Sequence, residues 1–222
     1  MSKKKTETET PILADEMLGK SEAFVLKYKN AIIGTIVAII LIVVGSMAYS
    51  TYIVEPKEEA ANKAIFHAEH MFIEGNYDAA LNGDGINAGF LKIIDDHSGT
   101  DASNIAAAYA GLCYANLGNY DDAIKFLEDY DGNDKVIAPK VKHALGTCYA
   151  HKEEWNKAIE LVLEAAEEGD NIAVAPECLR DAAAMYEKIG KKEKALELYN
   201  RIKTEYPDAP TVNIDQLINS VK

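Results

Sequence analysis

The chain has 222 residues, of which 48% are hydrophobic, and a formal net charge of −13 at neutral pH. A chain of this length can hold one or two ordinary domains. So strong an excess of negative charge repels phosphate backbones, which excludes nucleic acid as an expected partner.

The first segment, residues 1–29, carries six lysines, and residues 30–54 then contain no charged residue at all. As a helix this uncharged run would be about 37 Å long, and a bilayer's hydrocarbon core is about 30 Å thick. We therefore predict a transmembrane anchor over 30–54. A buried core helix and a cleaved signal peptide ending near Ala48 are the alternatives. The length of the run and of its charged leader favours an uncleaved anchor.

Lysines are unevenly distributed about this segment, with Lys27 and Lys29 directly before it and glutamates prevailing just after it. By the positive-inside rule the 1–29 leader is cytoplasmic. Residues 55–222 then lie outside the cytoplasm, which in a bacterium with two membranes means the periplasm, with the anchor in the inner membrane.

An internal pattern of a small residue, an aromatic residue, a turn residue and an alanine recurs three times in the remaining sequence. The copies are Gly111, Tyr114, Gly118, Ala123; then Gly146, Tyr149, Glu153, Ala158; then Ala183, Tyr186, Gly190, Ala195. Small residues let two helices pack closely, and glycine accepts a positive φ in the turn between them. Each copy thus predicts a helical hairpin, with a slightly different turn where Glu153 replaces glycine.

Weaker signals flank these copies. A degenerate repeat at about 60–100 has Met71 in the aromatic position and a turn-rich insert over 82–89, which should break or lengthen its second helix. The full repeats are expected at about 104–137, 139–172 and 176–209. The apolar spacing of 211–222 predicts a terminal capping helix.

This pattern resembles the tetratricopeptide repeat. The resemblance implies an all-α fold in which the single N-terminal transmembrane helix is followed by a solenoid of helical hairpins. In such a solenoid the first helices of the hairpins line a concave binding face. The positions expected to face it form a candidate protein-binding groove: Leu112, Ala115, Asn116, His143, Thr147, His151, Arg180, Ala184 and Glu187.

The sequence motifs that could indicate a metal site, a phosphate-binding loop or a catalytic residue are all incomplete. His67 and His70 have the wrong spacing for a metalloprotease pair, and the 129–134 loop has Asp134 where a calcium loop needs glycine. The glycines of 82–89 follow a helix and not a strand, unlike a phosphate-binding loop. Cys113, Cys148 and Cys178 read as small buried packing residues. We therefore expect no enzyme activity, no catalytic residue, no metal, no cofactor and no small-molecule substrate.

The layout of a lysine-bearing leader, one anchor and acidic repeats resembles the YfgM-like family of envelope proteins. The run from Leu81 to Asp96 is similar to Bacteroidota members. The resemblance implies an ancillary subunit of the Sec translocon that accompanies a PpiD-type periplasmic chaperone and emerging secreted chains. A structural scaffold for envelope or division complexes is the alternative, and a secreted adaptor would require cleavage near Ala48.

Overall fold

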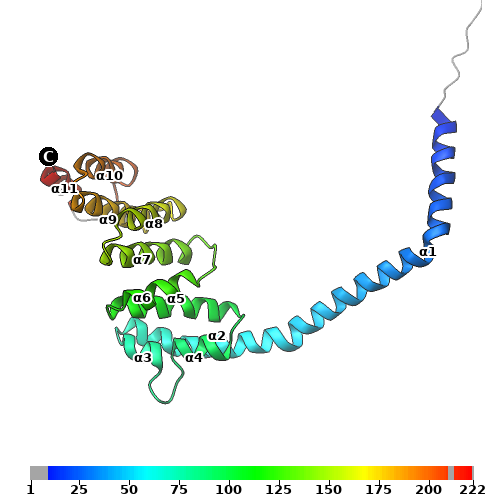
Figure 1. The fold of residues 1–222 in the computed structure, drawn as a ribbon, viewed down its shortest axis with the longest axis horizontal. Helices are drawn as coiled ribbons and strands as arrows, with labels where there is room; N and C mark the ends of the chain where they lie inside the picture. Colours follow the sequence, from blue (N-terminus) through cyan, green and yellow to red (C-terminus); the bar gives the residue numbers. More distant parts are fainter. Residues whose placement is uncertain (1–9, 210–212, 222) are drawn as a thin grey trace, which may run out of the picture. The chain divides into compact units, whose positions relative to one another are not determined.

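The computed structural model describes residues 10–209 and 213–221, and within these ranges all regular structure is helical (Figure 1). The chain divides into two compact units, Met1–Glu55 and Pro56–Lys222.

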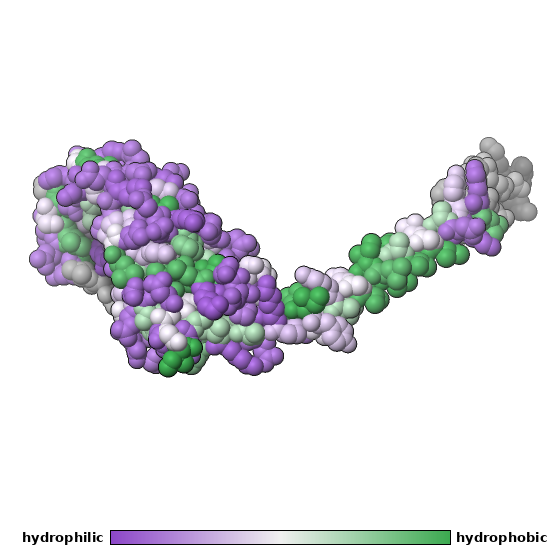
Figure 2. All heavy atoms as spheres, turned by 60° about the horizontal axis from the view of Figure 1, so that its bottom comes forward, coloured by the Kyte–Doolittle hydropathy of each residue, from purple (hydrophilic) through white to green (hydrophobic). Residues whose placement is uncertain are grey.

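The first unit consists of helix α1 (Thr10–Tyr49) and a π-helical turn (Ser50–Val54). The expected span over 30–54 thus covers the second half of α1 and the π-helical turn that follows it. Its apolar side chains are exposed, Leu41 to 67% and Ile42 to 70%, and form the hydrophobic stretch coloured green in Figure 2. Within the described residues, Leu26–Ile73 is the one helical stretch long and apolar enough to cross a membrane. This is compatible with a single-pass membrane protein.

The second unit is a stack of helical hairpins, which Figure 1 shows in chain order from α2 to α11. Its helices are α2 (Glu55–Ile73), α3 (Tyr77–Asn82), α4 (Phe90–Asp96), α5 (Asp101–Asn116), α6 (Tyr120–Glu128), α7 (Ile137–His151), α8 (Trp155–Glu168), α9 (Ala175–Lys188), α10 (Lys192–Glu205) and α11 (Ile214–Val221). Helices α5 and α6, α7 and α8, and α9 and α10 pair within hairpins, and α6 packs on α7 as α8 packs on α9. The all-α fold class and the solenoid of hairpins are confirmed.

The small residues of the pattern lie where the two helices of a hairpin meet. The pattern alanines Ala123, Ala158 and Ala195 are fully buried. A side chain added at Gly146 would place its Cβ 2.6 Å from Val162 Cγ2 and 2.9 Å from the Ala158 carbonyl oxygen. Because interiors are packed at crystal-like density, these residues set the distance between the paired helices.

The turns inside the hairpins share one hydrogen-bonded form. In the α5–α6 turn, the Gly118 N–H donates to the Ala115 carbonyl and the Asn119 N–H to the Tyr114 carbonyl. These are the two bonds of a Schellman motif, which requires a positive φ at its central residue. The bonds recur at the same spacing in the α7–α8 turn, where Glu153 has a φ of 62°. Our expectation of a different turn at Glu153 was therefore wrong.

Glu153 is the one non-glycine residue with a positive φ in the described chain. We expect Glu153→Gly to stabilise the protein by roughly 0.5–1 kcal/mol, because relief of left-handed strain exceeds the entropy that glycine adds to the unfolded state. Thermal unfolding would show a higher Tm. Glu153→Gln is the matched control, since it removes the charge and keeps the strain. An equal gain in both variants would contradict a backbone origin.

The insert in the first repeat breaks its second helix into α3 and α4. Asp84 Oδ1 accepts hydrogen bonds from the N–H groups of Ile86 and Asn87, at 2.8 and 2.6 Å. A Cβ at Gly89 would lie 2.3 Å from the Gly83 nitrogen, so the two ends of the loop touch. The loop, visible between α3 and α4 in Figure 1, therefore leaves and rejoins the helical stack at nearly the same point. Directly after it, Phe90 and Ile93 are buried in the core.

The far end of the stack is closed by α11, which packs on α10 and buries Ile218 and Val221. Positions 211, 212 and 222 of the expected capping helix lie outside the described residues. The three cysteines are free and buried, as predicted. Burial raises the pKa of the Cys113 and Cys178 thiols to about 12, so these thiols stay protonated and unreactive.

Candidate protein-binding surface

The groove positions predicted from the repeat pattern lie on three helices. Leu112, Ala115 and Asn116 belong to α5, then His143, Thr147 and His151 to α7, then Arg180, Ala184 and Glu187 to α9. Helix α5 contacts α7 directly, so first helices of successive hairpins adjoin.

Two of these positions, Thr147 and Ala184, line one recess of about 270 Å³. The recess also takes in Trp155, which starts α8, together with Met185. Its walls are therefore an indole, a thioether and two small side chains, with the charged side chains of Asp181 and Lys188 completing the lining. The indole, the thioether and the small side chains can accept an apolar side chain through burial of nonpolar area.

A polar cluster centred on Asp181 borders this recess. His143 Nε2 donates to Asp181 Oδ2 at 2.9 Å, while Arg180 Nε and Nη2 donate to Oδ1 at 3.0 and 2.8 Å. Burial opposes ionisation of the Asp181 carboxyl, but the hydrogen bonds from His143 and Arg180 outweigh it and lower its pKa. Asp181 is thus an ionised acceptor that fixes the side chains of two predicted groove residues, His143 and Arg180, the first of them across the gap between α7 and α9.

The other predicted positions have local roles outside the recess. Asn116 donates to the Leu112 carbonyl at 2.8 Å. The ring of His151 stacks on that of Tyr120, with centroids 4.3 Å apart. Glu187 accepts a 2.7 Å hydrogen bond from the Tyr199 hydroxyl, which ties α9 to α10.

Sequence reasoning missed Trp155, Asp181, Met185 and Lys188, which complete the lining of the recess. Asp181 and Lys188 could have been found, because both fall on the helical stripe that contains Ala184. Trp155 could not, since it lies in the next helix and only the hairpin turn brings it beside Thr147.

The histidine and calcium-like motifs form structural contacts. The His67 ring lies 3.1 Å from Asp84 Oδ2 and 2.9 Å from the Asn87 amide nitrogen, which holds the insert against α2. Asp134 Oδ1 accepts from the N–H groups of Val136 and Ile137 at the start of α7. Among the described residues, no three His, Cys, Asp or Glu side chains gather as a metal ion would require.

Comparison with known protein families supports the repeat assignment. A model of the tetratricopeptide repeat family matches residues 109–130 and 177–209. The first match begins in α5 and ends just after α6, and the second begins in the first turn of α9 and ends just after α10. The chain therefore contains tetratricopeptide repeats.

A curated relative and several solved structures resemble the chain. An uncharacterised protein of Aquifex aeolicus (strain VF5) is 28% identical over 182 residues, covering 81% of this chain and 89% of the relative. Two crystal structures of MamA are 18% identical, with TM-scores of 0.56 and 0.58, and cover 69% and 73% of this chain and 81% of each MamA chain.

A crystal structure of TPR-like repeats of a putative kinesin light chain from Podosopora anserina gives a TM-score of 0.57 at 11% identity. It covers 74% of this chain and 84% of that one. At such identities the likeness of these structures shows the fold alone.

Proposed function

We propose that this chain, whose second unit has the tetratricopeptide-repeat fold, is a membrane-anchored protein-binding module. The observation that carries the proposal is the recess between α7 and α9, lined by Thr147, Trp155, Ala184 and Met185. Tetratricopeptide repeats mediate protein–protein interactions, and this recess has the size and apolar lining to accept one side chain of a bound segment.

The polar cluster beside the recess supports a protein ligand over a small molecule. The polar side chains of His143, Arg180 and Asp181 bond mainly to one another, so few polar groups are left to orient a compact ligand. An extended segment gains affinity from many weak contacts along the repeats, and polar groups at the edge of the recess set its register.

The exposed apolar helix gives the module its location. Residues 30–54 would hold the repeats at a membrane surface, and the lysine distribution about the span supports a cytoplasmic leader with periplasmic repeats. Confinement to one membrane raises the effective concentration of any partner in that membrane. The binding energy of the repeats therefore need not be large.

Within this function we propose a role as an ancillary subunit of the Sec translocon, in the network of periplasmic chaperones. The support is the resemblance of the layout, a lysine-bearing leader, one span and acidic repeats, to the YfgM-like family. Expected partners are translocon subunits, a PpiD-type chaperone and emerging secreted chains. A scaffold for envelope or division complexes is the second candidate, since the repeat fold by itself does not select the partner.

Purification in mild detergent followed by mass spectrometry tests these functions. We expect translocon subunits and a periplasmic folding factor to co-purify with the full chain. Replacement of 30–54 by an unrelated span should weaken this set, and so should the triple change His143→Ala, His151→Ala, Arg180→Ala. A partner set without any secretion component would favour the scaffold. If neither change alters the co-purifying proteins, the proposed roles of the apolar span and of the groove in partner binding are both contradicted.

A further inference from the structure

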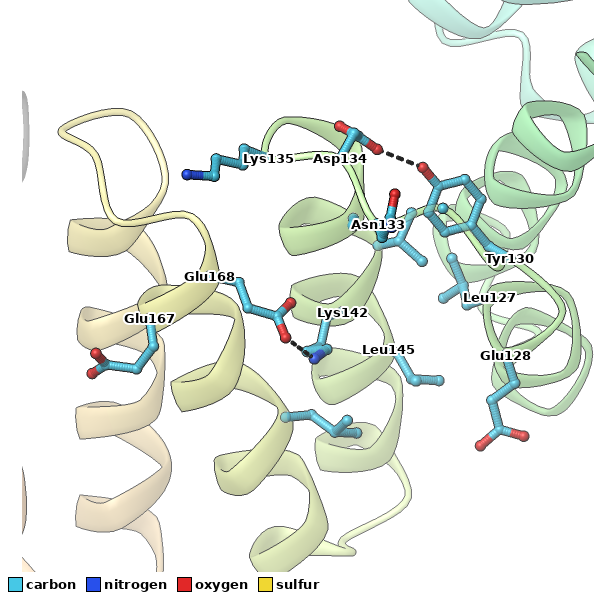
Figure 3. Close-up of a pocket in the computed structure, with 14 residues that line it drawn as sticks. Leu127, Glu128, Tyr130, Asn133, Asp134, Lys135, Lys142, Leu145, Glu167 and Glu168 are labelled. Atoms are coloured by element: carbon cyan, nitrogen blue, oxygen red, sulfur yellow. Dashed lines mark hydrogen bonds and ion pairs between the residues drawn. The ribbon is translucent and has the colours of Figure 1, made fainter. Parts of the chain in front are cut away.

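A second and larger recess lies between α6, α7 and α8, under the loop that joins α6 to α7 (Figure 3). Its volume is about 750 Å³, within the range of ligand-binding pockets. Buried or half-buried apolar side chains form its floor: Leu127, Ala138, Val141, Leu145 and Leu161. We call it the α6–α8 recess.

The α6–α8 recess and the recess beside Thr147 open on different faces of α7. A helix turns by about 100° per residue. Val141 and Leu145 consequently lie on roughly the opposite side of α7 from His143 and Thr147. A ligand in the α6–α8 recess would therefore leave the groove positions free, and the two surfaces can be tested separately.

Two of the polar groups that line the α6–α8 recess, Lys142 and Tyr130, already have partners within the protein. Lys142 donates to Glu164 at 3.1 Å and also pairs with Glu168, and Figure 3 shows the second of these contacts across the recess. The Tyr130 hydroxyl donates to Asp134 at 2.8 Å. Since these groups are satisfied, the free energy available to a ligand comes chiefly from covering the apolar floor.

The rim of the α6–α8 recess is acidic. Glu167 and Glu168 belong both to it and to an adjoining hollow around Leu163, which adds Glu160 and Glu164. The two hollows together are lined by six carboxylates and two ammonium groups. Glu167 also pairs with Arg201 of α10 at 2.6 Å, so the net charge of these nine groups is −3. Such a surface attracts cations over several ångströms and repels acidic partners.

We propose that the α6–α8 recess is a second protein-docking site, which takes an apolar side chain from a partner segment rich in lysine and arginine. The apolar floor would bury the anchoring side chain. The glutamates of α8 would face the flanking cations, which stay in water and contribute attraction without full desolvation. The proposal goes beyond the groove function, because the site lies on the other side of α7 and uses different residues.

A direct binding measurement on the full chain in nonionic detergent tests the site. The probe is a fluorescein-labelled peptide with a leucine–phenylalanine pair between two runs of three lysines, followed by fluorescence anisotropy. The comparison peptide has glutamate in place of every lysine. All protein variants are measured in the same detergent, so a difference in peptide affinity between variants comes from the protein and not from the micelles.

Two recess variants have matched controls in α10. Leu161→Gln places an amide on the apolar floor, and its control is Leu196→Gln, which changes another half-buried leucine. Glu160→Gln with Glu167→Gln removes two charges and leaves the contacts of Lys142 intact, but it also removes the ion pair between Glu167 and Arg201 of α10. Its control is Glu193→Gln with Glu205→Gln, two exposed glutamates outside the recess, of which Glu205 is the other partner of Arg201. The Tm of each variant shows whether its fold is retained.

We expect the chain to bind the lysine peptide at least about tenfold more tightly than the glutamate peptide. Each recess variant should weaken that binding about fivefold, the scale of one moderate interface residue, while the α10 controls and the change of His143 and Arg180 to alanine leave it unchanged. Equal binding by recess variants and controls would overturn the proposal. So would a loss confined to the His143 and Arg180 variant, which would place the peptide in the groove.

Discussion

Ala158→Trp is expected to lower the free energy of unfolding by about 3 kcal/mol. Ala158 is fully buried, and its carbonyl oxygen lies against Gly146 of the partner helix. An indole at this position has to push α7 and α8 apart, because neither helix can retreat from the hairpins packed on it. For a domain of this size the change corresponds to a decrease in Tm of roughly 6–12 °C.

Circular dichroism during heating would measure this effect, with Asn156→Trp as the control. Asn156 is exposed on the same helix, so a tryptophan there adds the same group without entering the hairpin. Since each repeat is stabilised by its neighbours, the loss of stability should spread to the next hairpin. The backbone amide hydrogens of α9 and α10 should therefore exchange faster as well. An unchanged Tm for Ala158→Trp would contradict the packing described for this hairpin.

The second large effect is expected in the apolar span. Ile39→Arg combined with Val43→Arg places two charges one helical turn apart near its centre. Each arginine at that depth costs about 2.5–3.5 kcal/mol on insertion scales, and no acidic residue of 30–54 can pair with it. We expect the doubly substituted chain to leave the membrane fraction on alkaline carbonate extraction.

Ile39→Leu combined with Val43→Leu is the control for the span, since it retains the apolar character and the length. The wild-type chain and this control should both resist carbonate and high salt, because hydrophobic insertion is not screened by ions. Full retention of the arginine variant in the membrane pellet would contradict a transmembrane role for this helix.

Much of the fold could be predicted from local patterns. The small–aromatic–turn–alanine pattern located the paired helices around Ala123, Ala158 and Ala195, because close helix packing demands small side chains at fixed spacing. Glu153 shows the limit of such reasoning. A glutamate in place of glycine predicted a different turn. The two Schellman hydrogen bonds and the neighbouring hairpins nevertheless impose a φ of 62° on Glu153.

The binding surfaces were predictable only in part. Thr147 and Ala184 follow from the repeat pattern, and both line the recess beside α9. His151, by contrast, stacks on Tyr120, because the angle between successive hairpins brings α6 close to the end of α7. No periodicity in the sequence encodes that angle.

The sequence by itself determined the helical class, the repeat register and the apolar span, since these depend on spacing within one helix or between adjacent ones. Only the tertiary structure decided which side chains share a recess. A turn brings Trp155 to the same recess as Thr147, and the stacking of two hairpins places Leu127 and Leu161 along one recess. These pairs are 8 and 34 positions apart in the sequence. Their proximity arises from the packing of whole helices, which local preferences do not specify.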